Sequence, residues 1–132
     1  MKTKNIVSIA LRLVAAFIML QTLYFKFTGQ PESIYIFSQV GIEPWGRIGT
    51  GIAELIASAL LLIPATIAVG ALLSIGIMMG AVITHLFILG IEVQGDGGQL
   101  FAYAMIVLIS SVVLLIMHYQ QLLQFKARLV RS

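Results

Sequence analysis

Four long apolar stretches divide the chain, and a short polar segment separates each one from the next. They cover about residues 5–27, 45–63, 67–91 and 100–117. A membrane-spanning helix needs about 20 mainly apolar residues, so each stretch is long enough to cross a bilayer. The pattern therefore predicts an all-α membrane protein: a four-transmembrane-helix bundle in which residues 1–132 form a single membrane domain.

A shorter amphipathic segment lies between the first two stretches. Pro31 suits the first turn of a helix, and Gly41 suits its C-terminal exit. Between them Ile34, Phe37 and Val40 recur at helical spacing. The segment is too short to span a bilayer, so we expect a short interfacial helix between helices 1 and 2.

The other connections are short or polar. Residues 64–66 read as a tight turn, and residues 92–99 as a polar, glycine-rich loop. The tail, residues 118–132, carries three basic residues and no acid. Its leucine and phenylalanine side chains are expected to touch the bilayer.

Small residues recur at four-residue spacing on two of the predicted spans. The second span carries Gly49, Ala53 and Ala57, and the third carries Gly76 and Gly80. Such faces let helix backbones approach closely. We expect them to pack helices within the bundle, with subunit association into a homo-oligomer as the alternative.

The composition agrees with a membrane location and excludes several activities. The chain is 60% apolar and 10% charged, whereas soluble domains are about a quarter charged. It has no cysteine, which excludes thiol–disulfide exchange, Cys-ligated zinc and iron–sulfur clusters within this chain. The net charge of +3 comes without a basic stripe interleaved with aromatics, so no nucleic acid partner is expected.

The charged residues predict an orientation. Four spans place both termini on one side, with five cations: Lys2, Lys4, Lys126, Arg128 and Arg131. The other side carries four acids: Glu32, Glu43, Glu92 and Asp96. Excess Lys and Arg stay cytoplasmic, which predicts cytoplasmic termini in a bacterial-type inner membrane. A secretory signal peptide is the alternative for the N-terminus, but Arg12 interrupts the apolar region and no small-x-small cleavage site follows.

One acid lies within the second span. Glu54 follows Trp45 by nine residues, roughly 13 Å along a helix and near the bilayer midplane. Arg47, Thr50, Glu54 and Ser58 share one helix face. A charged residue at that depth costs about 2.5–3.5 kcal/mol, so Glu54 needs a partner, a neutral form or a function.

Candidate partners come from the outer halves of two other spans. Thr22 and Lys26 share a face of the first helix, and His85 lies toward the outer end of the third. We expect one outward-opening pocket in which Glu54 and His85 exchange protons. The expected ligand-binding residues are Lys26, Arg47, Thr50 and Thr22. The alternative is structural: polar groups that only hold helices together, with the two cations snorkelling to the interface.

The residues do not support haem ligation, nucleophilic catalysis, phosphate binding or metal binding. His85 and His118 belong to opposite ends of their spans, so they cannot ligate one haem together. No nucleophile triad, phosphate-binding loop or dedicated metal site occurs. No intrinsic cofactor is expected, and a quinone stays open as a ligand.

Several short motifs in a fixed order resemble the DoxX family of small four-helix membrane proteins. They are "LRL" at 11–13, "KF" at 26–27, Phe37 with Gly41 and Pro44, "GIAEL" at 51–55 and "HL" at 85–86. The resemblance covers about residues 8–118. It implies a four-span bundle with an interfacial segment, and it carries over at Arg12, Lys26, Gly41, Glu54 and His85. Relatives usually have small residues where this chain has residues 21–24, which leaves a close crossing there open.

The family implies fold more strongly than function. Some members resemble subunits of thiosulfate–quinone oxidoreductases, others associate with redox enzymes, and distant relatives assist membrane-protein assembly. Our first hypothesis is an accessory subunit of a redox system that binds a quinone or lipid and takes electrons from a redox partner protein. A non-catalytic helper and a small proton-coupled transporter are the alternatives.

Overall fold

The computed structural model describes residues 2–131, and it confirms the predicted fold class. Within these residues no strand occurs, and four stretches of helix are long and apolar enough to cross a membrane. The helices that form them are α1 (Lys2–Phe27), α3 (Trp45–Leu62), α4 (Ile67–Thr84) and α5 (Gln99–Met117). Each begins or ends within a few residues of its predicted boundary.

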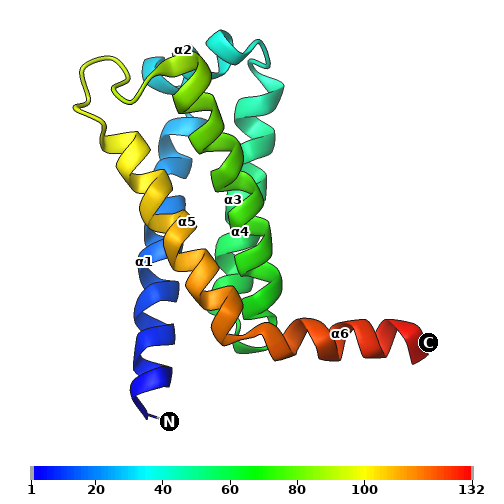
Figure 1. Ribbon diagram of the computed structural model, residues 1–132. Coiled ribbons are helices and arrows are strands. Elements are labelled where there is room, and N and C mark those ends of the chain that lie inside the picture. The colour runs from blue at the N-terminus through cyan, green and yellow to red at the C-terminus, as the bar shows by residue number, and fades with distance from the viewer. Residues whose placement is uncertain (1, 132) are drawn as a thin grey trace.

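The four helices form a closed ring of neighbours. α1 packs on α3 and α5, and α4 packs on the same two helices. Both termini lie at one end of the bundle (Figure 1), here called the terminal end. The opposite end, here called the loop end, holds the connection from α1 to α3 and the loop from Gly90 to Gly98.

The predicted short helix lies at the loop end. α2 (Pro31–Val40) begins at the proline, and Gly41 ends it with a φ of 87°. The Gly41 N–H donates to the carbonyls of Phe37 and Ser38, so two unpaired carbonyls of the last turn are satisfied. α2 contacts α1, α3 and the end of the third span, which places it over the loop end.

The third span changes helix type before it ends. α4 continues into η2 (His85–Leu89), a single π-helical turn. Gly90 closes the turn, because its N–H donates to the His85 carbonyl at 2.7 Å and its φ is 84°. A turn of this kind is frequent at functional sites, and it fixes the position of His85.

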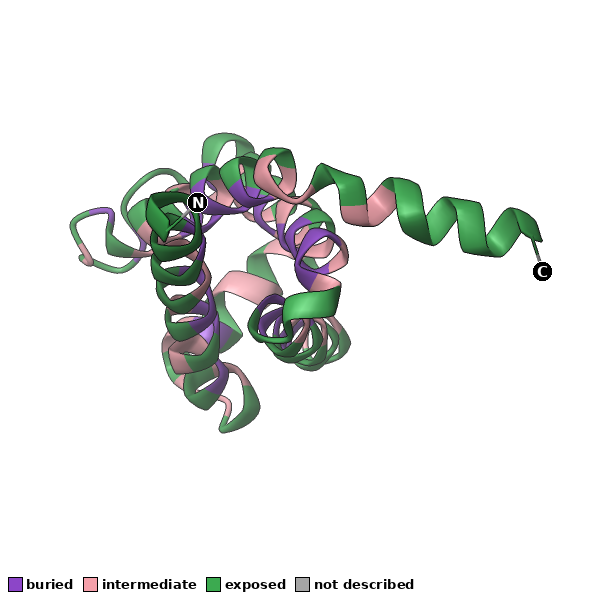
Figure 2. Ribbon diagram, turned by 90° about the horizontal axis from the view of Figure 1, so that it is seen from below, coloured by how far each residue is buried: buried purple, intermediate pink, exposed green. Residues whose placement is uncertain are grey.

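The tail forms a helix that the sequence analysis did not predict. α6 (Tyr119–Arg131) leaves the terminal end sideways and runs away from the bundle (Figures 1 and 2). Gln121 ties it to the start of α4: its side-chain carbonyl accepts from the Ala68 N–H at 2.9 Å, and its amide donates to the Pro64 carbonyl at 2.8 Å. Pro64 begins the short 3₁₀ turn η1 (Pro64–Thr66).

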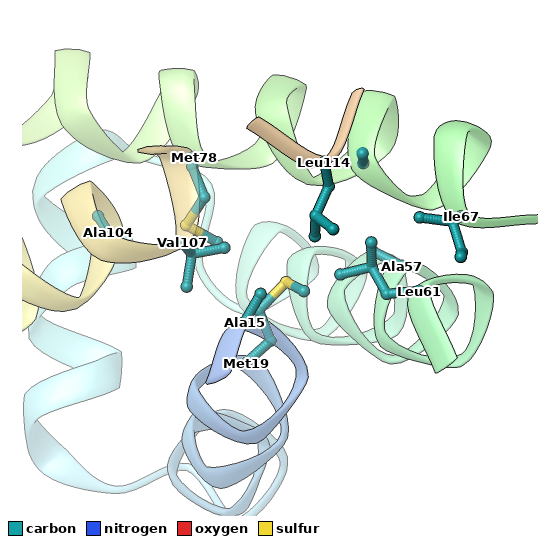
Figure 3. Close-up of a cluster of buried hydrophobic side chains, with 10 residues drawn as sticks. Ala15, Met19, Ala57, Leu61, Ile67, Met78, Ala104, Val107 and Leu114 are labelled. Atoms are coloured by element: carbon teal, nitrogen blue, oxygen red, sulfur yellow. The ribbon is translucent and has the colours of Figure 1, made fainter. Parts of the chain in front are cut away.

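The apolar core is a cluster of buried side chains between the spanning helices (Figure 3). All four spanning helices contribute to it. Its buried residues are Ala15, Met19, Ala57, Leu61, Ile67, Ala71, Met78, Ala104, Val107 and Leu114. Side chains therefore fill this part of the bundle, and open space is left toward the loop end.

Two arginines hold the antiparallel helices α1 and α3 together. Arg12 of α1 donates to the carbonyls of Leu61 and Leu62 at the end of α3, at 2.6 and 2.9 Å. Arg47 of α3 donates to the carbonyl of Lys26 at the end of α1. The last carbonyls of a helix lack partners within it and carry partial negative charge, so each helix supplies a cation for the end of the other.

The close helix contacts lie at glycines other than the predicted ones. A Cβ atom on Gly51 would lie 2.7 Å from the ring of Phe27, and one on Gly70 would lie 2.8 Å from the backbone nitrogen of Leu61. Gly51 therefore permits the approach of α1 to α3, and Gly70 permits the approach of α4 to α3.

The packing role predicted for the four-residue glycine pattern is wrong at three positions. A Cβ atom on Gly49, Gly76 or Gly80 would meet no atom within 4 Å. The spacing is correct, but no neighbouring helix comes close enough to use it. Ala57, on the same face of α3, is fully buried in the core as expected.

Candidate functional site

A cavity of about 740 Å³ lies toward the loop end of the bundle. Side chains from α1, α2, α3, α4, η2 and α5 line it. Its wall is mostly apolar, and polar side chains are set into it at a few places. Ligand pockets typically measure about 300–1,000 Å³ and have this composition.

The main polar feature of the wall is an ion pair between α1 and α3. The Lys26 Nζ lies 2.8 Å from the Glu54 Oε1. Thr22 places its hydroxyl 3.1 Å from the Glu54 Oε2 and 2.8 Å from the carbonyl of Met19. Lys26 also donates to the Thr22 hydroxyl at 3.3 Å. Thr22 and Lys26 are one turn apart on α1, which explains why both reach the same carboxylate.

This ion pair is largely shielded from solvent. The side chain of Glu54 is 4% exposed and that of Lys26 is 16% exposed. Lys26 therefore turns inward to Glu54 and does not snorkel away from the bundle. An ion pair at such a depth is maintained only when both charges have partners, and here Thr22 supplies an additional one.

His85 stands on another part of the cavity wall. Its ring lies 3.0 Å, through Nδ1, from the carbonyl of Gly90. Because a carbonyl can only accept, Nδ1 carries the proton in this contact. The ring also meets Phe101 edge-on, with 5.6 Å between ring centroids. Nδ1 is thus occupied, and Nε2 is the nitrogen left for a ligand.

The loop after η2 is held by one carboxylate. Asp96 accepts from the backbone N–H groups of Val93, Gly98 and Leu100, at 3.0, 2.8 and 3.2 Å. Burial of Asp96 opposes its ionisation, but these three bonds, aided by His85, lower the pKa of Asp96 below its usual value. Asp96 also caps the start of α5, because Leu100 lies in its first turn.

Arg47 belongs to the surroundings of the cavity and not to its lining. It binds Glu43, one turn earlier, through Nε at 2.9 and 3.1 Å, and it also holds the Lys26 carbonyl. The predicted site residues that line the cavity are Thr22, Lys26, Thr50, Glu54 and His85. Arg47 acts behind this set by fixing the end of α1.

Several polar lining residues were not singled out from the sequence. Glu32 and Ser33 come from α2, and Gln99 and Tyr103 from α5. The Gln99 amide donates to the Tyr103 hydroxyl at 2.9 Å. The spacing of Gln99 and Tyr103 indicates a shared helix face. No sequence signal, however, places α2 or α5 beside Glu54.

The geometry defines a class of protein: a small four-span helical membrane protein with a polar cavity at one end. A family model described as the DoxX-like family matches residues 10–114. The chain belongs to the DoxX-like family, which confirms the resemblance found in its motifs. Comparison with curated proteins and with solved structures gave no match. Among residues 2–131, no group of three His, Asp or Glu side chains is arranged to hold a metal ion.

Proposed function

We propose that the chain is an accessory membrane subunit of a redox system, and that its cavity binds a lipid-soluble quinone or a similarly uncharged lipid. The observation that supports this proposal is the buried ion pair of Lys26 and Glu54 in the wall of a mostly apolar cavity. Intramembrane ionisable groups that face a cavity commonly mark functional sites.

The charges around the cavity favour an uncharged head group. The charge of Lys26 is balanced by Glu54 at 2.8 Å, and that of Arg47 by Glu43 at 2.9 Å. Glu32 adds an acid to the lining. A phosphate head group needs surplus cations, and this cavity offers none among its described lining residues. A quinone carbonyl needs only a hydrogen-bond donor.

The site has hydrogen-bonding capacity left for such a ligand. The Lys26 ammonium has three donors, of which two are directed to Glu54 and Thr22. The third is free to donate to a carbonyl. The Nε2 of His85 accepts in this tautomer, so it can bond the hydroxyl of the quinol form. Reduction of a quinone to a quinol takes two electrons and two protons. The electrons would come from a redox partner protein. The two protons would come from water at the loop end, taken up by the Glu54 carboxylate and the Nε2 of His85 and passed on to the quinone oxygens.

Mass spectrometry of small molecules retained after gentle detergent purification tests the proposal. The wild type should retain a near-stoichiometric quinone or uncharged lipid, and Glu54→Gln should lose it. Glu43→Gln is the matched control, since it makes the same change to an acid that pairs with Arg47 outside the lining. An empty wild-type cavity, or full retention by Glu54→Gln, would overturn the proposal.

A non-catalytic helper is the second candidate, and one observation favours it. Both oxygens of Glu54 are satisfied within the chain, by Lys26 and Thr22, as a purely structural pair would be. In that case Glu54→Gln would reduce folding or capture of a partner membrane protein, with no small molecule retained by the wild type.

A proton-coupled transporter is supported least. Alternating access needs a route from the central site to each side of the membrane. The core residues Leu61, Val107 and Leu114 lie fully buried between the cavity and the terminal end. Opening that side would require the best-packed part of the bundle to separate.

We also propose that the terminal end faces the cytoplasm of a bacterial-type inner membrane. The ends of α1 and α6 carry Lys2, Lys4, Lys126, Arg128 and Arg131. Excess cations stay on the cytoplasmic side. The cavity would then lie in the outer half of the bilayer.

A further inference from the structure

Helices α3 and α4 touch closely toward the terminal end. Gly70 of α4 lies so near Leu60 and Leu61 of α3 that a Cβ atom on Gly70 would come within 2.8–2.9 Å of them. On α3 the edge that makes this contact continues toward the loop end through Ala57, Ala53 and Gly49, at helical spacing. This edge of α3 therefore reaches the level of the cavity.

At the level of the cavity, the glycines of α3 and α4 contact no neighbouring helix. Gly49 on α3 and Gly76 and Gly80 on α4 all line the cavity, and all three are exposed. A Cβ atom on any of them would meet nothing within 4 Å. The two helices thus leave a gap at the level of these glycines, and the gap connects the cavity with the outside of the bundle.

The gap opens to a lipid-facing surface. Ile52 of α3 and Met79 and Ile83 of α4 are large apolar side chains, 48%, 44% and 49% exposed. Within a membrane-spanning bundle, exposed apolar side chains face hydrocarbon. A molecule that leaves the cavity through this gap therefore enters the bilayer and not water.

A second observation points to a ligand inside. His85 is 6% exposed and lines the cavity, and only its Nδ1 has a hydrogen-bond partner in the described part of the chain. The Nε2 is not sealed inside the wall, so it can bond a group that enters the cavity. Since Nδ1 carries the proton, Nε2 would accept from a hydroxyl group at the polar end of a ligand.

We propose that the gap at Gly49, Gly76 and Gly80 is a side opening through which the apolar tail of an uncharged amphiphile passes from the cavity into the bilayer. This inference rests on the proposed function, because it assigns the head group to the wall formed by Lys26 and His85. It adds the route of entry and a ligand class: a neutral head group with an apolar tail.

The test compares two probes that share a head group. They are a dimethoxy-methyl-benzoquinone with no side chain and the same quinone with a decyl side chain, each titrated into purified protein in nanodiscs of neutral lipid. Gly80→Leu fills the opening from α4, and Gly49→Leu fills it from α3. Ala59→Leu is the matched control, since it adds a similar side chain at an exposed position of α3 outside the lining.

We expect each glycine variant to bind the decyl quinone at least tenfold more weakly than the wild type and the tailless quinone within about twofold of it. Ala59→Leu should bind both probes as the wild type does. One variant is made on each helix, so that the test still works if one of them fails to fold. A monodisperse elution profile and an unchanged melting temperature show that a variant is folded.

The outcomes separate the two proposals. If the wild type binds neither probe, the proposed function fails and the side opening fails with it. If the wild type binds both probes and folded Gly80→Leu or Gly49→Leu binds the decyl quinone unchanged, the quinone site stands and the side opening is overturned. An equal loss of both probes in the glycine variants also overturns it, because the leucine would then be occluding the head-group site itself.

Discussion

At the scale of single residues, the pair of Lys26 and Glu54 sets the character of the cavity. Both charges are shielded, and each has a second contact with Thr22. Removal of one member leaves the other buried without its counter-charge, whereas removal of both leaves no buried charge. Each residue of the pair therefore stabilises the fold only while the other one is present.

A double-mutant cycle on this pair should show that dependence. Glu54→Gln alone is expected to lower the free energy of unfolding by about 3 kcal/mol, since Lys26 loses its partner. Lys26→Met combined with Glu54→Gln should recover much of the loss, with a coupling free energy of about 2 kcal/mol. Unfolding in mixed micelles measures all four proteins. Additive effects would contradict the expected coupling.

His118 is a second titratable contact, outside the spans. Its Nε2 lies 2.8 Å from the Ser8 hydroxyl and joins the end of α5 to the start of α1. Burial lowers the pKa of His118 below its usual 6.5, and the nearby charges of Arg12 and Lys4 lower it further. The folded protein therefore holds this imidazole in its neutral form more strongly than the unfolded chain does.

The sign of the pH effect follows from that difference. The contribution of His118 is complete above pH 6.5, the unfolded value, and it is lost as the pH falls from there toward the lower pKa of the folded state. Melting temperatures measured across this window should decline in the wild type. His118→Gln should show a smaller decline, with His85 present in both proteins. An identical decline in both would contradict the assignment.

At the scale of elements, the Gln121 side chain ties α6 to the start of α4. The two hydrogen bonds of Gln121 reach the Ala68 N–H and the Pro64 carbonyl. Ala68 is fully buried and lies in the first turn of α4, where a backbone N–H has no partner within the helix. Gln121 therefore caps α4 and anchors α6 in one contact.

Gln121→Ala should release this anchor. Loss of a hydrogen bond to a buried N–H costs about 1–3 kcal/mol, and we expect faster amide hydrogen exchange at Ala68 and along α6. Gln120→Ala is the control, because Gln120 is exposed on the same turn. Unchanged exchange in Gln121→Ala would show that another contact holds α6.

The elements also show what the sequence could predict. The four spans follow from the lengths of the apolar runs, and α2 follows from its proline and glycine ends. α6 was missed because a helix of 13 residues is marginal alone, and no pattern reveals the distant contact of Gln121. The glycine pattern was misread because spacing on one helix does not say whether another helix approaches.

The site was predictable to a similar extent. Glu54 is conspicuous as an acid within an apolar run, and helical spacing indicates that Thr22 and Lys26 share a face. The Lys26 side chain could either snorkel to the interface or pair with Glu54. Only the position of α3, which carries Glu54, determines which of the two occurs. Glu32 and Tyr103 reach the cavity through the arrangement of α2 and α5, which local sequence does not encode.

At the scale of the whole molecule, the charges are divided between the two ends, and the orientation can be tested directly. The chain has no cysteine, so a single introduced thiol reports one position. In intact cells a membrane-impermeant maleimide should label Glu92→Cys at the loop end but not Gln124→Cys on α6. Gln124→Cys should react after lysis. Labelling of Gln124→Cys alone in intact cells would show that the protein has the opposite orientation.

The two arginine contacts between α1 and α3 have a consequence for how the protein is made. Synthesis delivers α1 to the membrane first, with Arg12 and Lys26 in it, and the groups that satisfy Arg12 are the carbonyls of Leu61 and Leu62. An unpaired cation in a spanning helix opposes insertion, most strongly at the helix centre and less toward its ends. α1 therefore gains its full stability in lipid only after the end of α3 has emerged from the ribosome. The second spanning helix therefore stabilises the first one in the bilayer.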